Sequence, residues 1–196
     1  PMKIIQMPKK VEYIIKKLQD NGYEAYIVGG CVRDSILGRV PGDWDITTSA
    51  KPWQVKKVFD RTVDTGIEHG TVTVMLDKEG FEVTTYRIDG EYEDSRHPKS
   101  VEFTGSLRED LARRDFTINA MAYNPSTGIV DLYEGLEDLK RKRVCCVGCA
   151  GQRFDEDALR ILRAVRFAAQ LKFDIEPKTA QAIREKAHLL KDRKST

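Results

Sequence analysis

The stretch that decides the fold is Tyr26-Ile27-Val28-Gly29-Gly30-Cys31-Val32-Arg33-Asp34-Ser35-Ile36-Leu37. Its first three residues are apolar and predict the end of a buried strand, whereas residues 32–37 carry apolar side chains at helical spacing. Gly29 and Gly30 are therefore expected at a strand-to-helix turn, which points free backbone N–H groups outward. With Arg33 one turn into the helix, this arrangement predicts a cradle for a phosphate chain. A Gly-Gly pair alone more often marks only a tight turn, so this interpretation depends on the residues beyond the helix.

Two aspartates, Asp43 and Asp45, come next in the chain. Residues 43–47 alternate polar and apolar side chains like a strand with one buried face, so both carboxylates are expected to face one spot. Adjacent carboxylates repel each other unless a cation lies between them, and hard oxygen ligands with room for waters and phosphates suit Mg²⁺. A solvated strand edge is the alternative for Asp-x-Asp alone. Together with the cradle, the pair is typical of metal-assisted phosphoryl or nucleotidyl transfer.

The composition is that of a soluble globular protein, with 40% hydrophobic and 33% charged residues in 196. No apolar run approaches the length of a membrane span, and residues 2–17 are amphipathic and rich in lysine, unlike a signal peptide. We therefore expect a cytoplasmic protein with no membrane partner. Residues 1–138 have a net charge of −6 and residues 139–196 a net charge of +8. That asymmetry suits an enzyme that binds metal in one half and RNA in the other, although two solvated helix faces would also produce it.

The four cysteines are Cys31, Cys145, Cys146 and Cys149. Cys146-x-x-Cys149 has the spacing of a zinc or redox motif, but a structural zinc site needs four ligands, and neither a second pair nor a nearby histidine is present. We interpret all four as reduced, partly buried thiols.

The remaining pattern mixes helices and strands. Helices are expected over residues 8–19, 51–59, 135–139 and 154–171, with a last one opening at Pro177. Strands are expected over residues 24–28, 62–65, 129–133 and 143–147, and residues 71–76 and 81–86 should form a hairpin across the turn 77–80. Residues 88–104 are polar, acidic and without a period, as in a long functional loop.

Further candidate residues lie in these elements. Glu82, between Phe81 and Val83 on the hairpin, either points to solvent or joins the aspartates as a third metal ligand or activator. Arg113, Arg114, Asp115 and Asn119 follow a helix that opens with the capping box Ser106-Leu107-Arg108-Glu109. They are suited to position a triphosphate and a ribose hydroxyl, the alternative being a surface ion-pair cluster.

A charged arc lies on the 154–171 helix, opposite an apolar face of Phe154, Ala158, Ile161, Leu162, Val165 and Ala168. Cytosine and adenine both present an amine donor beside a ring-nitrogen acceptor, whereas uracil and guanine present a carbonyl beside an N–H. An aspartate that only accepts and an arginine that only donates match the first pair. Asp157 and Arg160 are thus expected to accept CTP and ATP without a template, and Arg163 and Arg166 to bind phosphates. A surface i, i+4 pair of Glu156 and Arg160 is the simpler alternative.

In this order, Gly29-Gly30 with Arg33-Asp34, Asp43-x-Asp45, Arg113-Arg114-Asp115 and Glu156-Asp157-x-x-Arg160 resemble the class II CCA-adding tRNA nucleotidyltransferases of the polymerase-β-type superfamily. The resemblance implies an α+β fold: a polymerase-β-like nucleotidyltransferase head with a small mixed sheet and flanking helices, followed by an all-helical neck. The expected division is a head at 1–148 and a base-recognition neck at 149–196. Since members of the family continue through body and tail regions that bind tRNA, this chain is expected to be a head and neck portion.

The resemblance also implies roles for single residues. Asp43 and Asp45 would bind the catalytic Mg²⁺, and Glu82 is added as a catalytic candidate from its place on the hairpin alone. The nucleotide, CTP or ATP, would be bound by Gly29, Gly30, Arg33, Arg114, Asp115, Asp157, Arg160, Arg163 and Arg166. Asp89 and Arg96 would belong to the flexible loop that members need for the final A. The expected product is the CCA end of a tRNA, with no DNA partner.

Two rivals remain open at this point. A bacterial poly(A) polymerase shares most of these residues, and product length and CTP use separate the two. A non-catalytic nucleotide- or RNA-binding fragment belongs to another class, and it would bind nucleotide without incorporating it.

Overall fold

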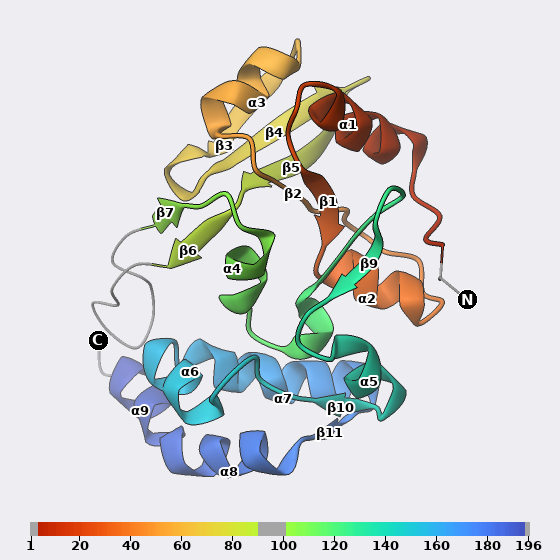
Figure 1. The fold of residues 1–196 in the computed structure, drawn as a ribbon. Coiled ribbons are helices and arrows are strands. Elements are labelled where there is room, and N and C mark those ends of the chain that lie inside the picture. The colour runs from red at the N-terminus through yellow and green to blue at the C-terminus, as the bar shows by residue number, and fades with distance from the viewer. Residues whose placement is uncertain (1–3, 90–100, 195–196) are drawn as a thin grey trace.

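The computed structural model describes residues 4–89 and 101–194, with a sheet and its helices above a layer of helices (Figure 1). The main sheet has seven strands in the order β3-β4-β5-β2-β1-β8-β9. All its neighbours are antiparallel except β2 and β5, so the sheet is mixed. The strands are β1 (Ala25–Val28), β2 (Ile46–Thr48), β3 (Thr62–Gly66), β4 (Thr71–Leu76), β5 (Glu79–Thr85), β8 (Met121–Asn124) and β9 (Gly128–Asp131).

Strand β1 lies inside the sheet, and all four of its residues are buried. A continuous apolar run suits such a strand because both of its faces are covered. Its partner β8 is also fully buried, and no strand was predicted there. The residues Met121-Ala122-Tyr123-Asn124 lack the alternation that marks a strand with one solvated face.

The helices around the sheet follow the predicted apolar spacing. In α1, Val11, Ile14, Ile15 and Leu18 are buried, as expected. The helices of this part are α1 (Lys9–Asp20), α2 (Gly30–Ile36), α3 (Pro52–Val58), α4 (Leu107–Ala112) and α5 (Gly135–Lys140), with short 3-10 turns η1 (Ile67–His69) and η2 (Thr117–Asn119).

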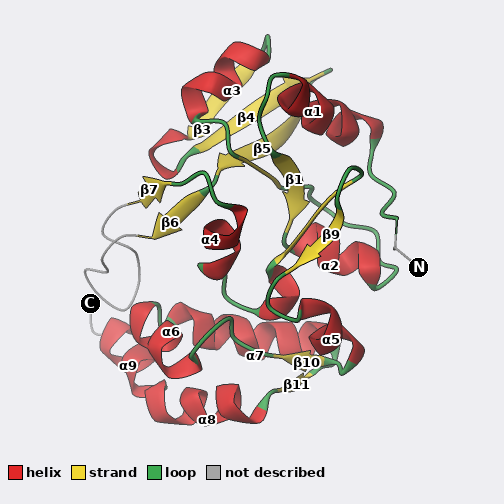
Figure 2. Cartoon of the chain, viewed as in Figure 1, coloured by secondary structure: helices red, strands yellow, loops and turns green. Residues whose placement is uncertain are grey.

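The lower layer in Figure 2 is almost entirely helical. This layer also contains a parallel pair of two-residue strands, and Phe116, Phe154 and Ile161 belong to one buried cluster that spans both parts. The predicted α+β class is confirmed, whereas the division at residue 148 stays a prediction. The elements are β10 (Arg143–Val144), β11 (Asp174–Ile175), α6 (Ala150–Glu156), α7 (Leu159–Leu171), α8 (Pro177–Lys186) and α9 (His188–Lys194).

Four predictions about these elements need correction. The 154–171 helix is two helices, because the backbone of Asp157 is extended (φ −148°, ψ 99°) and its carboxylate accepts a bond from the Leu159 N–H. On α7, Leu162 and Val165 are about half exposed, at 53% and 51%, so the buried face differs from the predicted one. The hairpin turn is two residues, Asp77 and Lys78, both at positive φ, as a tight turn between twisted strands requires.

The fourth correction concerns residues 88–104. Their ends pair as β6 (Arg87–Asp89) and β7 (Val101–Phe103), so this segment is not all loop. Arg96 lies outside the described residues.

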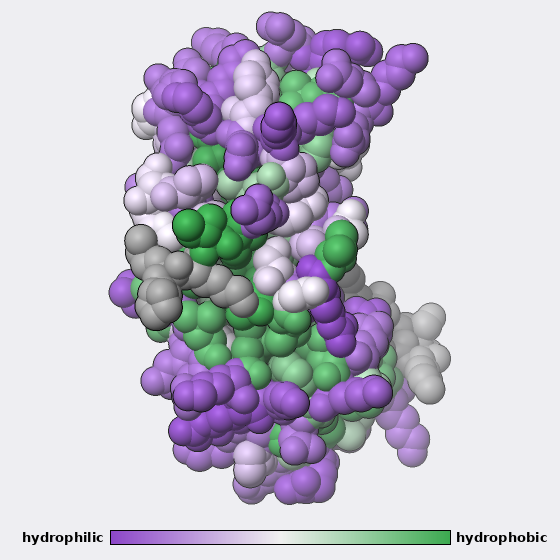
Figure 3. Space-filling view, turned by 90° about the vertical axis from the view of Figure 1, so that its right-hand side faces the viewer, coloured by the Kyte–Doolittle hydropathy of each residue, from purple (hydrophilic) through white to green (hydrophobic). Residues whose placement is uncertain are grey.

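The surface divides by hydropathy on the face shown in Figure 3, where hydrophilic residues cover both ends and apolar residues gather between them. Among residues 4–89 and 101–194, no helix combines the length and the apolar composition needed to cross a membrane. All four cysteines are free, and burial raises the pKa of the Cys31 thiol to about 11, so that thiol is protonated at neutral pH.

Candidate active site

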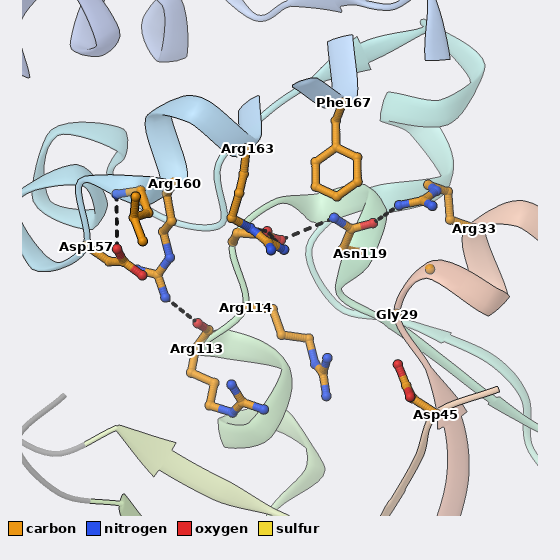
Figure 4. A pocket seen from close by; sticks show the side chains of 13 residues that line it. Gly29, Arg33, Asp45, Arg113, Arg114, Asn119, Asp157, Arg160, Arg163 and Phe167 are labelled. Carbon is orange, nitrogen blue, oxygen red and sulfur yellow. Dashed lines mark hydrogen bonds and ion pairs between the residues drawn. The ribbon is translucent and has the colours of Figure 1, made fainter. Parts of the chain in front are cut away.

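A pocket of about 500 Å³ lies where the sheet meets α7 (Figure 4). One wall comes from the β1–α2 turn and the end of α4, and the other comes from α7. Arginines dominate its lining, which suits an anionic ligand. It is lined by Gly29, Gly30, Arg33, Asp45, Arg113, Arg114, Asp115, Asn119, Asp157, Leu159, Arg160, Arg163 and Phe167.

The floor of the pocket is the predicted glycine turn. Gly29 has φ 82° and ψ −135°, a region that only glycine occupies without strain. Its N–H bonds the carbonyl oxygen of Met121 at 3.2 Å, which ties the turn to β8. A Cβ at Gly30 would lie 3.3 Å from a terminal nitrogen of Arg33, tighter than ordinary contact. Glycine at both positions thus leaves the backbone open to the pocket and Arg33 in place.

Asp43 and Asp45 lie just before β2 rather than on it, so the predicted strand alternation is wrong in detail. The parallel register Ile46↔Val83 nevertheless places Asp45 beside Glu82, since each residue immediately precedes one of the paired residues. All three carboxylates line a second hollow of about 570 Å³, and Asp45 lines both hollows. Through Asp45 the glycine turn and the carboxylate hollow are neighbours, whereas a shared metal and nucleotide site stays a prediction.

The pKa of Asp45 reflects its burial and the closeness of the other carboxylates. Desolvation by the surrounding pocket wall, and then the charges of Glu82 and Asp43, raise its pKa, while the nearby guanidinium of Arg114 opposes them. Within the part of the chain that the structure describes, no three His, Cys, Asp or Glu side chains form a ready-made metal cluster. Mg²⁺ is commonly held by one or two carboxylates together with phosphates and waters, so Asp43 and Asp45 fit it as a pair.

Arg114 is held by Asp110, a residue that sequence reasoning missed. Asp110 is fully buried and accepts bonds from a terminal nitrogen of Arg114 at 3.1 Å and from the hydroxyl of Thr47 at 3.2 Å. It also accepts a bond from the backbone N–H of Arg87. In the sequence Asp110 resembles any exposed acid in a first helical turn, and only the packing of α4 under the sheet buries it.

Positive charge is in excess around this carboxylate. Burial, and then the charges of Arg114 and Arg87, lower the pKa of Arg113 to about 10. Among the residues described, the buried Nε atoms of Arg113 and Arg114 have no hydrogen-bond partner. The Arg113 Nε lies 3.7 Å from Asp110, so one buried carboxylate faces two guanidinium groups and leaves net positive charge beside the pocket.

A chain of side chains crosses the pocket from α2 to α7, drawn dashed in Figure 4. Arg33 donates to the Asn119 carbonyl oxygen at 2.5 Å, and the Asn119 amide donates to Asp115 at 3.2 Å. Arg163 then donates from Nε to the same aspartate at 2.8 Å. Three predicted residues thus meet through Asn119, which the sequence had grouped with the Arg-Arg-Asp run.

Phe167 is the other residue that sequence reasoning missed. Its ring lies 5.2 Å from the guanidinium carbon of Arg33, 5.5 Å from that of Arg163 and 5.7 Å from that of Arg166. An aromatic face attracts cations, so one ring can gather three like charges. Arg166 contacts the ring, but it is not among the residues lining the pocket.

Asp157, in the break between α6 and α7, and Arg160, one turn later on α7, both line the pocket. Arg160 is only 7% exposed and donates to the backbone oxygen of Arg113 at 3.0 Å. The i, i+4 pair of Glu156 and Arg160 is also present, at 3.5 Å. Asp89 lies elsewhere and lines a separate hollow of about 350 Å³ with Arg113.

Comparison with known proteins identifies relatives of this arrangement. The family model of the poly A polymerase head domain matches residues 25–145. The CCA-adding enzyme of Lactococcus lactis subsp. cremoris is 50% identical over 195 residues, covering 96% of this chain and 48% of the relative. The chain thus spans about half the length of the curated relatives it matches.

Solved structures of related enzymes are also similar to this chain. The Bacillus stearothermophilus CCA-adding enzyme in complex with CTP superposes with a TM-score of 0.86 at 46% identity, covering 94% of this chain and 45% of that one. A tRNA nucleotidyltransferase with a primer tRNA and an incoming ATP analog has a TM-score of 0.71 at 33% identity, covering 90% and 50%.

Proposed function

Since the chain belongs to the poly A polymerase head domain family, we propose that it forms the head and neck of a template-independent tRNA nucleotidyltransferase. It would add C and A from CTP and ATP to the 3′ end of tRNA. The observation that carries this proposal is the position of Asp45, which lies where the carboxylate hollow meets the arginine-lined pocket. A nucleotide in that pocket would bring its phosphates to the carboxylates.

Asp43 and Asp45 are the residues proposed to hold Mg²⁺. The raised pKa of Asp45 supports this, because a cation would relieve the repulsion among these carboxylates. Bound Mg²⁺ would supply activation of the primer 3′ hydroxyl and neutralisation of charge on the pyrophosphate. Glu82, beside Asp45, is the proposed third catalytic carboxylate.

The triphosphate would be bound by the glycine turn of Gly29 and Gly30 and by the guanidinium groups around it. Arg33 and Arg114 both line the pocket, and a terminal nitrogen of Arg114 lies 3.7 Å from the position that a Cβ on Gly29 would take. Arg163 and Arg166, gathered on Phe167, would complete the positive wall. Asp115, an acceptor at the same place, is the proposed partner of the ribose hydroxyl.

The base would be selected by Asp157 and Arg160. Arginine carries five N–H donors, and the two bonds of Arg160 to the backbone oxygens of Arg113 and Arg153 leave others for a base. The carboxylate of Asp157 accepts only, so the pair matches the donor and acceptor edge of cytosine or adenine. Uracil and guanine present the reverse pattern and would be rejected.

Other predictions also remain part of this proposal. Asp89 and Arg96 would belong to the loop used for the final A, and the head and neck would divide near residue 148. The whole enzyme would act in the cytoplasm, on RNA and not on DNA.

The test is incorporation. The chain is incubated with Mg²⁺, labelled CTP or ATP, and tRNA lacking its 3′ CCA, and the products are sized on a gel. Two C residues and one A support CCA addition, whereas long A tracts without use of CTP indicate poly(A) synthesis. Nucleotide binding by calorimetry with no incorporation under any condition would support a non-catalytic binding module.

A further inference from the structure

Arg153 on α6 joins the lower helices to the turn that carries Arg113 and Arg114. One terminal nitrogen donates to the backbone oxygens of both residues, at 2.7 Å for Arg114. The other terminal nitrogen pairs with Glu156 at 3.2 Å. A single side chain thus bridges three oxygens from two parts of the fold.

Arg160 on α7 shares two of these partners. It donates to the Arg113 oxygen at 3.0 Å and pairs with Glu156 at 3.5 Å. It also donates to the backbone oxygen of Arg153 at 3.4 Å. We call this group the Arg153 clamp. It consists of the side chains of Arg153, Glu156 and Arg160 and the backbone oxygens of Arg113 and Arg114.

The clamp is well shielded from solvent. The side chains of Arg153, Arg160 and Glu156 are 14%, 9% and 24% exposed. Charge-assisted hydrogen bonds that are shielded in this way are stronger and more directional than exposed pairs. The clamp therefore holds α6 and α7 at a defined position against the Arg113–Arg114 turn.

The clamp also encloses the helix break. Asp157 lies in the break, with Arg153 one turn before it and Arg160 one turn after it. Arg153 itself does not line the arginine-rich pocket but lines the separate hollow that Asp89 and Arg113 also line. It therefore acts on the pocket only through its neighbours.

We propose that Arg153 is a positioning residue for base selection, fixing Asp157 and Arg160 at a set distance from the phosphate side of the pocket. The inference rests on the proposed function, in which those two residues read the base. The Arg113–Arg114 turn is the link between the two sides, since the side chain of Arg114 lies near Asp45 while its backbone oxygen accepts from Arg153. If the clamp were lost, the preference for CTP over UTP would fall while phosphate binding stayed intact.

The experiment compares the wild-type chain with Arg153→Gln and Arg153→Lys. Calorimetry with Mg²⁺ measures the affinity for CTP, for UTP and for inorganic tripolyphosphate. The matched control is Arg141→Gln, which removes an exposed Arg–Glu pair on α5. Circular dichroism first establishes that each variant is folded, and if the Gln variant is not, the Lys variant carries the test.

In Arg153→Gln, the preference for CTP over UTP should fall about tenfold, while tripolyphosphate affinity stays within about twofold. Arg153→Lys should restore part of the preference, because an ammonium reaches the carbonyl oxygens but cannot also form the planar pair with Glu156. The control should match the wild type.

Two results would overturn the inference while leaving the proposed function standing. One is an unchanged CTP preference in both variants. The other is an equal loss of affinity for CTP, UTP and tripolyphosphate, which indicates a purely structural role. A wild-type chain that binds CTP and UTP equally would instead contradict the proposed base reading, and the inference with it.

Discussion

Arg163 on α7 donates from both Nε and a terminal nitrogen to one carboxylate oxygen of Asp115, which follows α4. Asp115 is 7% exposed and also accepts from Asn119 and from the backbone N–H of Phe116. A buried carboxylate held by a helix from the other layer connects the two walls of the pocket. The geometry of the site is thus set by contacts between layers as well as by the glycine turn.

The first prediction concerns this ion pair. Arg163→Met should lower the free energy of unfolding by about 1–2 kcal/mol, because the charge of Asp115 loses its arginine partner while keeping its other bonds. Urea denaturation measures the change. The control Arg141→Met removes an exposed pair and should stay within about 0.5 kcal/mol. An Arg163→Met variant as stable as the control would show that the pair contributes no net stability.

The second prediction concerns Gly29. Gly29→Ala should destabilise the fold by about 1–3 kcal/mol, since a Cβ is strained at φ 82° and ψ −135°. Gly105→Ala is a suitable control because a Cβ there meets nothing within 4 Å and its φ is not in the left-handed region. Chemical denaturation of both variants checks this. Equal stabilities would mean that the turn relaxes to a conformation open to any residue.

The third prediction concerns Asp45 and pH. Because its pKa in the folded chain is raised, Asp45 costs no stability at low pH, where it is protonated in both the folded and unfolded states. The penalty develops as pH rises through the raised pKa and persists at neutral pH. Asp45→Asn should therefore raise the melting temperature of the metal-free chain at pH 7 and leave it nearly unchanged at low pH.

The same variant should lose the stabilisation that Mg²⁺ gives the wild type, since ligand binding to the folded state raises stability by mass action. Asp64→Asn, which alters a surface pair with Lys56, is the control. A metal-free Asp45→Asn chain that melts below the wild type at pH 7 would contradict the account of crowded carboxylates.

The fourth prediction concerns base choice. Asp157→Asn replaces an acceptor-only group with an amide that both accepts and donates, so discrimination against UTP should weaken about tenfold. This change is cleaner than a charge swap with Arg160, which is 7% exposed and bonded to two backbone oxygens. A binding competition between CTP and UTP measures the discrimination against UTP. Unchanged discrimination would remove Asp157 from base reading.

The sequence was most informative where structure is set locally. The strand, glycine turn and helix of residues 25–36 follow from apolar spacing and from two residues without side chains. The sequence left open whether Glu82 points to solvent or joins the aspartates, and it is the parallel register of β2 and β5 that places Glu82 beside Asp45.

What the sequence could not provide arises from tertiary contacts. The spacing of apolar residues does not reveal the break before α7. The break depends on the Asp157 carboxylate, which accepts the Leu159 N–H in place of a backbone carbonyl oxygen. Asp110 and Phe167 carry no motif; the first is recognised only by its burial and the second only by the three arginines around its ring. In each case part of the surroundings comes from residues remote in sequence, Thr47 for Asp110 and Arg33 for Phe167.

The central claim is that the glycine turn and the paired aspartates bind one magnesium nucleotide. Isothermal titration of CTP into the wild type and Asp43→Asn, each with and without Mg²⁺, tests it most directly. We expect saturable CTP binding that depends on Mg²⁺ in the wild type and weakens at least about tenfold in the variant. Equal CTP affinity in all four titrations would contradict the claim.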